Sequence, residues 1–185
     1  MKRHPQILNR AHTALLVVDV QTRLTKAVRN GQAMVAEVVK LVRGFRILGL
    51  PVFVTEQYPK GLGHTEPGIL EALGGNSAVV KATFSCCGAP DLVSGIRSRG
   101  VRQILVSGTE AHVCVQQTAL DLLSRDFQVQ LAVDAVASRK ELDYRTALDR
   151  MARSGVILTS VESALFELLE VSGTAEFKQV ASLIK

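Results

Sequence analysis

Three residues that lie far apart along the chain could act together as a base, a cation and a nucleophile. Asp19 follows the apolar run LLVV, Lys81 follows AVV (78–80), and Cys114 ends the string GTEAHVC (108–114). A carboxylate can accept a proton, and an ammonium beside it favours its charged form. A thiol that has lost its proton can attack a carbonyl carbon. These residue types therefore indicate hydrolysis through a covalent intermediate.

Short runs rich in β-branched residues alternate along the chain with segments of helical periodicity. We expect strands at 14–18, 51–55, 78–80, 103–106, 129–133 and 156–158, and helices at 31–48, 90–99, 113–125, 141–154, 161–169 and 175–184. This alternation is typical of a parallel sheet covered by helices on both faces. The sequence predicts an α/β fold, a Rossmann-like three-layer α/β/α sandwich with a six-stranded parallel sheet. Residues 1–185 are expected to form one domain.

The expected strands place the three candidate residues at one edge of this sheet. Asp19, Lys81 and the segment that leads to Cys114 each follow a strand, and open α/β sheets bind ligands at the carboxyl ends of their strands. Cys114 is expected near the start of a helix, where backbone N–H groups favour a thiolate and can hold an oxyanion. Gly108 permits a sharp exit from the preceding strand.

Each of these residues also has a plainer explanation. An Asp after a strand is commonly a cap, a Lys at the rim of a sheet extends its ammonium to solvent, and a single Cys is more often a small core residue. The coincidence of all three on successive strand ends favours a catalytic site.

Three strings resemble the isochorismatase-like cysteine hydrolases: LLVVDVQ (15–21), VVKATFS (79–85) and VSGTEAHVCVQQTALDLL (106–123). The resemblance extends from about residue 13 to about residue 170. The family consists of three-layer α/β/α enzymes and includes nicotinamidases and carbamoyl amidases. The strings EQYPKGLGHT (56–65) and FSCC (84–87) are most similar to its subgroup of uncharacterised isochorismatase-domain proteins.

The resemblance implies a catalytic triad and an oxyanion hole. The triad would be Asp19, Lys81 and Cys114. A cis peptide bond is implied between Thr109 and Glu110, and the backbone N–H groups of Glu110 and Cys114 would hold the oxyanion. The thiol nucleophile favours acyl chemistry, because isochorismatases that cleave an enol ether lack it.

One part of the sequence departs from the nicotinamidase pattern. Nicotinamidases carry a metal-binding Asp-x-His after the second strand, where this chain has Glu56-Gln57-Tyr58. Tyr58 replaces the histidine, and His64 lies too far along the chain to be assumed a substitute. We therefore expect no metal and no cofactor, and nicotinamide is a doubtful substrate. The substrate pocket is expected to include Gln57, Tyr58, Phe84 and Thr109.

Other notable residues receive structural interpretations. Cys86 and Cys87 are expected to be structural or to line the pocket, since adjacent cysteines cannot easily share one tetrahedral metal site. His112 is expected to pack or to form a pocket wall, and Asp134 to cap a loop, with 134–139 near the same rim. The irregular stretch 56–77 exceeds a normal loop and is expected to be a functional loop or lid.

The composition of the chain narrows the classes of partner that we expect it to bind. Hydrophobic residues make up 47% and charged residues 21%, as in globular proteins. The formal charge of +5 is spread along the chain, and without Trp and with two Tyr a platform for stacking bases is poorly supplied. We expect no nucleic-acid partner, and no membrane partner because no apolar run reaches about 18 residues. Three Cys and an N-terminus without a secretory apolar region predict a cytoplasmic protein.

The leading expectation is a cysteine hydrolase that cleaves a C–N bond, amide or carbamoyl, of a small molecule through a thioester. Two alternatives remain open: a non-catalytic scaffold or binding protein that retained the pocket, and a nuclease or nucleic-acid binder, which only the positive charge favours. The resemblance also implies a homo-oligomer, a dimer or larger, and the apolar segments 161–169 and 177–184 are candidate interface regions.

Overall fold

The computed structural model describes residues 3–75 and 78–185, and within these ranges six strands form one parallel sheet. The strand order is β3-β2-β1-β4-β5-β6. The strands are β1 (Thr13–Val18), β2 (Val52–Gln57), β3 (Val79–Lys81), β4 (Gln103–Thr109), β5 (Gln128–Ala137) and β6 (Ile157–Thr159). The expected fold class is confirmed. The largest difference is in β5, which extends four residues beyond its expected end at 133.

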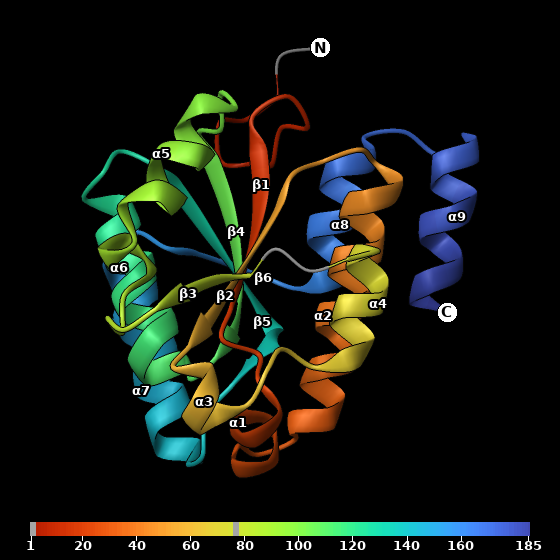
Figure 1. Ribbon diagram of the computed structural model, residues 1–185. Coiled ribbons are helices and arrows are strands. Elements are labelled where there is room, and N and C mark those ends of the chain that lie inside the picture. Colours follow the sequence, from red (N-terminus) through yellow and green to blue (C-terminus); the bar gives the residue numbers. More distant parts are fainter. Residues whose placement is uncertain (1–2, 76–77) are drawn as a thin grey trace.

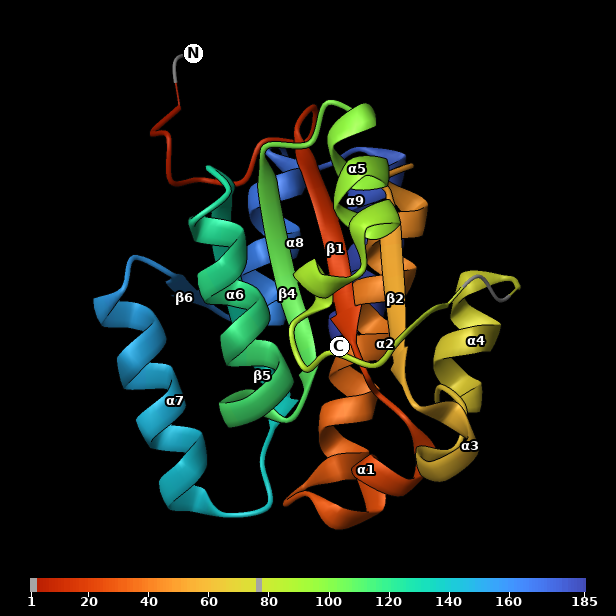
Figure 2. The ribbon, with the colours of Figure 1, turned by 60° about the vertical axis from the view of Figure 1, so that its left-hand side comes forward.

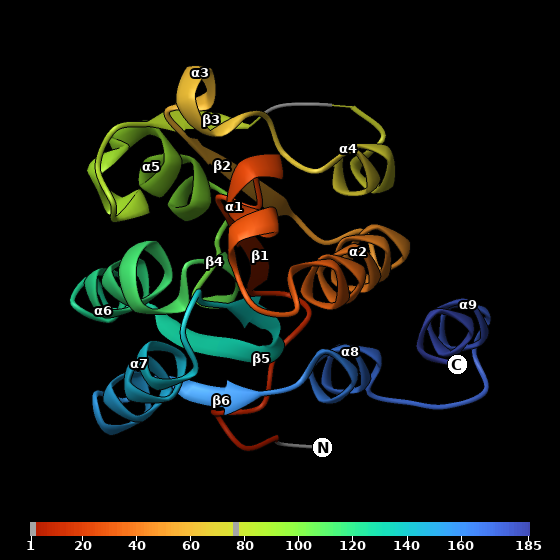
Figure 3. The ribbon, with the colours of Figure 1, turned by 90° about the horizontal axis from the view of Figure 1, so that it is seen from below.

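Helices cover both faces of the sheet and make the three layers seen in Figure 1 and, along the strands, in Figure 3. One layer holds α5 (Pro90–Ser98), α6 (Gln116–Leu123) and α7 (Glu141–Arg153), which lie in front of the strands in Figure 2. The other holds α2 (Gly31–Ile47), α4 (Pro67–Leu73), α8 (Val161–Leu169) and α9 (Ala175–Ile184). None of the helices in the described ranges is long and apolar enough to cross a membrane.

The central strand β1 is buried on both faces, which explains its uninterrupted apolar sequence. Leu15 and Val17 pack into the core on the α2 side, whereas Leu16 and Val18 pack into the core on the α5–α7 side. Asp19 follows this strand directly and therefore emerges at the middle of the carboxyl edge of the sheet.

The stretch 56–77 is not the long irregular loop that the sequence indicated. It contains α3 (Pro59–Leu62) and α4, and each begins with a proline in its first turn, where the missing N–H costs no hydrogen bond. A further short helix, α1 (Thr22–Ala27), also escaped the sequence analysis. Asn76 and Ser77, the last two residues of the stretch, lie outside the described residues.

Hydrogen bonds fasten the segment between α3 and α4 to the chain that follows β1. The side-chain amide nitrogen of Gln21, Nε2, donates to the carbonyl oxygens of Gly63 at 2.5 Å and Gln57 at 3.1 Å. The Glu66 N–H donates to the Val20 carbonyl oxygen at 2.9 Å. These contacts hold the ends of β1 and β2 together beside Asp19.

Candidate active site

Asp19 lies fully buried just after β1, and its two carboxylate oxygens accept hydrogen bonds from different strands. Thr55 Oγ1 in β2 donates to Oδ1 at 2.8 Å, and Lys81 Nζ at the end of β3 donates to Oδ2 at 2.6 Å. The backbone of Asp19 has a φ of +49°, which is unusual for a residue other than glycine. The carboxylate is therefore held in one orientation at the sheet edge.

The ammonium of Lys81 is surrounded by oxygen atoms. Besides Asp19 Oδ2, Nζ donates to Gln57 Oε1 at 2.7 Å and to the carbonyl oxygens of Thr83 and Phe84, both at 3.1 Å. An ammonium has three N–H protons, so these four acceptors use all of them. Lys81 can act on a substrate only through its charge and through Asp19.

Cys114 lies in the π-helical turn Ala111–Val115 that precedes α6, close to the expected helix start. Its thiol lies near the Asp19 carboxylate, and 6% of the residue is exposed. Burial and the negative charge of Asp19 raise the pKa of the Cys114 thiol to about 12, although Lys81 opposes the shift. The resting thiol therefore keeps its proton, and a base must remove it before it can attack.

The end of β4 approaches the end of β1 closely. Gly108 has a φ of +125°, and a Cβ atom there would lie 2.0 Å from the Val18 carbonyl oxygen, so only glycine fits. Thr109 Oγ1 donates to the Asp19 carbonyl oxygen at 2.6 Å, and the Thr109–Glu110 peptide bond is cis. These contacts set the position of the turn that carries Cys114 relative to Asp19.

The four residues that the sequence assigned to the substrate pocket fall into two groups. The polar groups of Gln57 and Thr109 are used within the protein. The Gln57 side-chain amide accepts from Lys81 Nζ and donates to the Ala82 carbonyl oxygen. The Thr109 hydroxyl donates to the Asp19 carbonyl oxygen. Tyr58 and Phe84 are 61% and 55% exposed. Their backbones lie beside Lys81: the Tyr58 N–H donates to the Lys81 carbonyl oxygen at 3.4 Å, and the Phe84 carbonyl oxygen accepts from Lys81 Nζ.

Two residues near Asp19 have contacts that the sequence did not predict: Thr55 was not singled out, and Cys86 was expected only to be structural or to line the pocket. Thr55 is fully buried, and its Oγ1 lies 3.5 Å from Cys86 Sγ. Cys86 is 1% exposed, and burial raises the pKa of its thiol to about 11. The alternation of side chains along β2 could have placed Thr55 on the same face as Gln57, two residues later.

The residues in the place of a nicotinamidase metal site have a structural use. Glu56 Oε1 accepts from the Thr65 N–H at 2.7 Å and from its hydroxyl at 2.8 Å, and Oε2 lies 3.2 Å from His64 Nδ1. Burial alone would raise the pKa of Glu56, but these hydrogen bonds hold it below its usual value. Across the described residues, no group of three or more His, Cys, Asp or Glu side chains is arranged to hold a metal ion.

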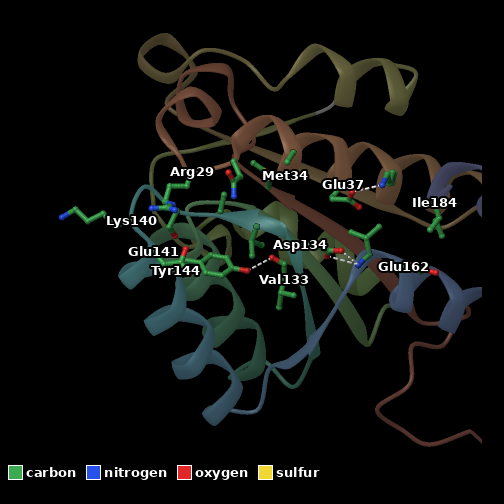
Figure 4. Close-up of a pocket in the computed structure, with 17 residues that line it drawn as sticks. Arg29, Met34, Glu37, Val133, Asp134, Lys140, Glu141, Tyr144, Glu162 and Ile184 are labelled. Carbon is green, nitrogen blue, oxygen red and sulfur yellow. Dashed lines mark hydrogen bonds and ion pairs between the residues drawn. The ribbon is translucent and has the colours of Figure 1, made fainter.

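A cavity of about 530 Å³ lies farther along the carboxyl edge of the sheet, between α2 and α7 (Figure 4). Asp134 lies within β5 rather than in a loop, and its carboxylate accepts from the Val161 N–H at the start of α8, at 3.0 and 3.2 Å. Arg139 instead reaches Glu110 at 2.7 Å, and His112 Nδ1 lies 3.0 Å from Ser138 Oγ. None of the three candidate triad residues lines this cavity.

Comparison with known proteins identifies the family. The isochorismatase domain matches residues 13–163, which is most of the chain. The chain belongs to the isochorismatase domain family. The resemblance inferred from its motifs is therefore confirmed.

Relatives within the isochorismatase domain family cover nearly all of this chain. It is 40% identical to isochorismatase domain-containing protein 1 of Salmo salar over 95% of this chain and 62% of the relative. It is 34% identical to isochorismatase domain-containing protein 2 of Homo sapiens over 94% of this chain and 83% of the relative. The chain thus spans less than two thirds of the length of the first of these relatives.

Solved structures share the isochorismatase domain fold. The MAR1 ribonuclease of Caenorhabditis elegans is 37% identical with a TM-score of 0.88, over 96% of this chain and 91% of that chain. The YcaC gene product of Escherichia coli, described as an octameric hydrolase of unknown specificity, is 23% identical with a TM-score of 0.90, over 99% and 92%. The second likeness concerns the fold alone.

Proposed function

We propose that this chain is a cysteine hydrolase that cleaves a C–N bond, amide or carbamoyl, of a small molecule through a thioester on Cys114. The observation that carries the proposal is the buried ion pair between the Asp19 carboxylate and Lys81, 2.6 Å apart, at the sheet edge where the Cys114 thiol lies close enough to respond to the charge of Asp19. Membership of a family of hydrolases supports the same reaction class.

In the first half of the reaction, Asp19 accepts the thiol proton and Cys114 Sγ attacks the carbonyl carbon of the substrate. The C=O electron pair moves onto oxygen, and the backbone N–H groups of Glu110 and Cys114 stabilise this oxyanion. When the oxyanion collapses, the C–N bond breaks and Asp19 returns the proton to the leaving nitrogen. The products are an amine or ammonia and a thioester on Cys114.

In the second half, Asp19 accepts a proton from water as the water oxygen attacks the thioester carbonyl. The C–S bond then breaks, the acid product leaves, and the proton passes from Asp19 to the sulfur. The cycle returns Cys114 and Asp19 to their starting states, with one water consumed for each C–N bond broken.

Lys81 stabilises the ionised Asp19 and lowers the energy of nearby negative charge without donating to the substrate. Its N–H protons are already used by Asp19, Gln57 and two carbonyl oxygens. The oxyanion therefore depends on backbone donors. Tyr58 and Phe84, which are exposed beside Lys81, are the side chains we assign to the non-reacting part of the substrate.

Mass spectrometry tests this proposal directly. The protein is incubated with a library of small amides, carbamoyl compounds and esters, and the Cys114 peptide is examined for an added acyl group. We expect an adduct in the wild type and in Cys87→Ala, which alters a cysteine that we place outside the reaction, and none in Cys114→Ala. Amide turnover by Cys114→Ala would refute the mechanism.

A nuclease is the second candidate, because the Caenorhabditis elegans structure at 37% identity carries the name ribonuclease. The run of basic residues at Arg97, Arg99 and Arg102 does not favour a nuclease. Arg97 and Arg99 lie over the rings of Phe127 and Phe53, at 5.1 and 5.7 Å, and they precede β4, at the opposite end of the sheet from Cys114. RNA degradation that wild type performs and Cys114→Ala lacks would favour this candidate over amide hydrolysis. Absence of both activities would favour a non-catalytic scaffold.

We further propose a cytoplasmic homo-oligomer that needs no metal or cofactor. Three free cysteines fit a reducing compartment. The homo-oligomer is what the resemblance of the motifs to the isochorismatase-like hydrolases implies. Size-exclusion chromatography with light scattering tests the assembly, and unchanged alkylation of Cys114 after dialysis against a chelator tests the independence from metal.

A further inference from the structure

We propose that Thr55 is a positioning residue of this reaction: its hydroxyl, supported from behind by the Cys86 thiol, holds the Asp19 carboxylate in the orientation in which it can take the Cys114 proton. This inference rests on the proposed function, because it assigns a role to a residue that touches the base rather than the substrate.

The position of Thr55 in the sheet brings it to the base. β2 lies between β1 and β3, so its side chains lie between Asp19, which follows β1, and Lys81, which ends β3. Thr55 pairs in register with Val79 of β3, two residues before Lys81. Its side chain is fully buried, and Oγ1 lies 2.8 Å from Asp19 Oδ1.

Counting protons gives this contact a direction. A threonine hydroxyl has one proton, and an ionised carboxylate can only accept, so the Thr55 proton points to Asp19. In the 3.5 Å contact between Thr55 Oγ1 and Cys86 Sγ, the thiol must then be the donor. The raised pKa of the Cys86 thiol is consistent with this, because the sulfur keeps its proton near neutral pH. The chain of donation runs from Cys86 to Thr55 to Asp19.

Cys86 is itself fixed to α6, the helix that follows the turn with Cys114. Its backbone N–H donates to Thr118 Oγ1 at 2.9 Å, and Thr118 lies one helical turn after Cys114. Its neighbour Cys87 donates its backbone N–H to Ser85 Oγ at 3.2 Å. The two adjacent cysteines therefore differ in role, and Cys87 is a matched control for Cys86.

The consequence is a fixed base. With Lys81 on Oδ2 and Thr55 on Oδ1, the carboxylate cannot rotate away from Cys114. Loss of the Thr55 donor leaves one side of the carboxylate without this constraint. The Asp19-dependent deprotonation of Cys114 then becomes slower than in the wild type.

The test is the rate at which iodoacetamide alkylates Cys114 at pH 7, followed by mass spectrometry of the Cys114 peptide. Thr55→Val keeps the shape but removes the hydroxyl, and we expect it to slow alkylation about tenfold. Thr55→Ser restores the hydroxyl and should restore the rate. Thr13→Val removes an equally buried hydroxyl that bonds the Asn9 carbonyl oxygen instead, and it should leave the rate unchanged.

The outcomes separate this inference from the proposed function. If Asp19→Asn is alkylated at the wild-type rate, Asp19 is not the base and the proposed function fails. If Asp19→Asn slows alkylation but Thr55→Val does not, or Thr55→Ser slows it as much as Thr55→Val, only the role of Thr55 is overturned. Should Thr55→Val not fold, Cys86→Ala decides: a smaller loss of rate, absent from Cys87→Ala, supports the chain of donation, and an unchanged rate overturns it.

Discussion

The Lys81 ammonium lies 2.6 Å from Asp19 Oδ2, and the two side chains are 1% and 0% exposed. A buried ion pair adds little net stability, but removal of one partner leaves a buried charge without compensation. We expect Lys81→Met to lower the free energy of unfolding by about 3–5 kcal/mol, measured by urea denaturation at pH 7. The double variant Asp19→Asn/Lys81→Met should regain part of this loss. A single variant as stable as the wild type would contradict the buried pair.

Gln57 gives a prediction that separates positioning from substrate binding. Its amide oxygen accepts from Lys81, and its amide nitrogen donates to the Ala82 carbonyl oxygen. If it only orients Lys81, Gln57→Leu should lower kcat about tenfold or more and leave KM close to the wild-type value. Steady-state kinetics on a substrate identified by the adduct screen measures both constants. A raised KM with unchanged kcat would return Gln57 to the substrate pocket.

Glu56 predicts a pH-dependent contribution to stability. Its pKa is held below the usual value in the folded chain, so its contribution is present above about pH 4.5 and is lost as the pH falls through the folded-state pKa. Glu56→Gln should lose about 2 kcal/mol at pH 7, a fall in Tm of about 4–8 °C, because the charged acceptor for Thr65 is gone. Calorimetry below pH 4 should find the variant and the wild type nearly equal. A difference that stays constant from pH 7 to pH 3 would show that the carboxylate charge is unimportant.

Gly108 predicts a large effect of a single added methyl group. Its positive φ and the 2.0 Å approach to the Val18 carbonyl oxygen make alanine strained there, and we expect Gly108→Ala to cost about 3 kcal/mol or more. At Gly95 in α5, an added methyl group would meet no atom within 4 Å, so Gly95→Ala should stabilise by about 0.5–1 kcal/mol. Chemical denaturation of the pair provides the comparison, and similar values for both would refute the close approach of β1 and β4.

The sequence predicted the strand ends well and the supporting contacts poorly. Asp19, Lys81 and the segment that leads to Cys114 were singled out because each follows an expected strand, and parallel strands bring such positions to one edge. Thr55 gave no such signal, and Gln57 was assigned to the substrate pocket, since the contacts of both depend on which atoms face them across β1 and β3. The short helices α3 and α4 were missed because their glycines and prolines hide a helical period, although Pro59 and Pro67 mark their first turns.

The proposed catalysis depends on Asp19 taking the proton of Cys114, and p-nitrophenyl acetate tests this step without the natural substrate. Acylation of Cys114 releases p-nitrophenolate in a burst that stopped-flow absorbance follows, and Cys114→Ala should show none. We predict that Asp19→Asn slows the burst by about 10²–10⁴-fold at pH 7 while Cys114 remains present and the chain folded. A burst of wild-type rate in Asp19→Asn would contradict the central claim.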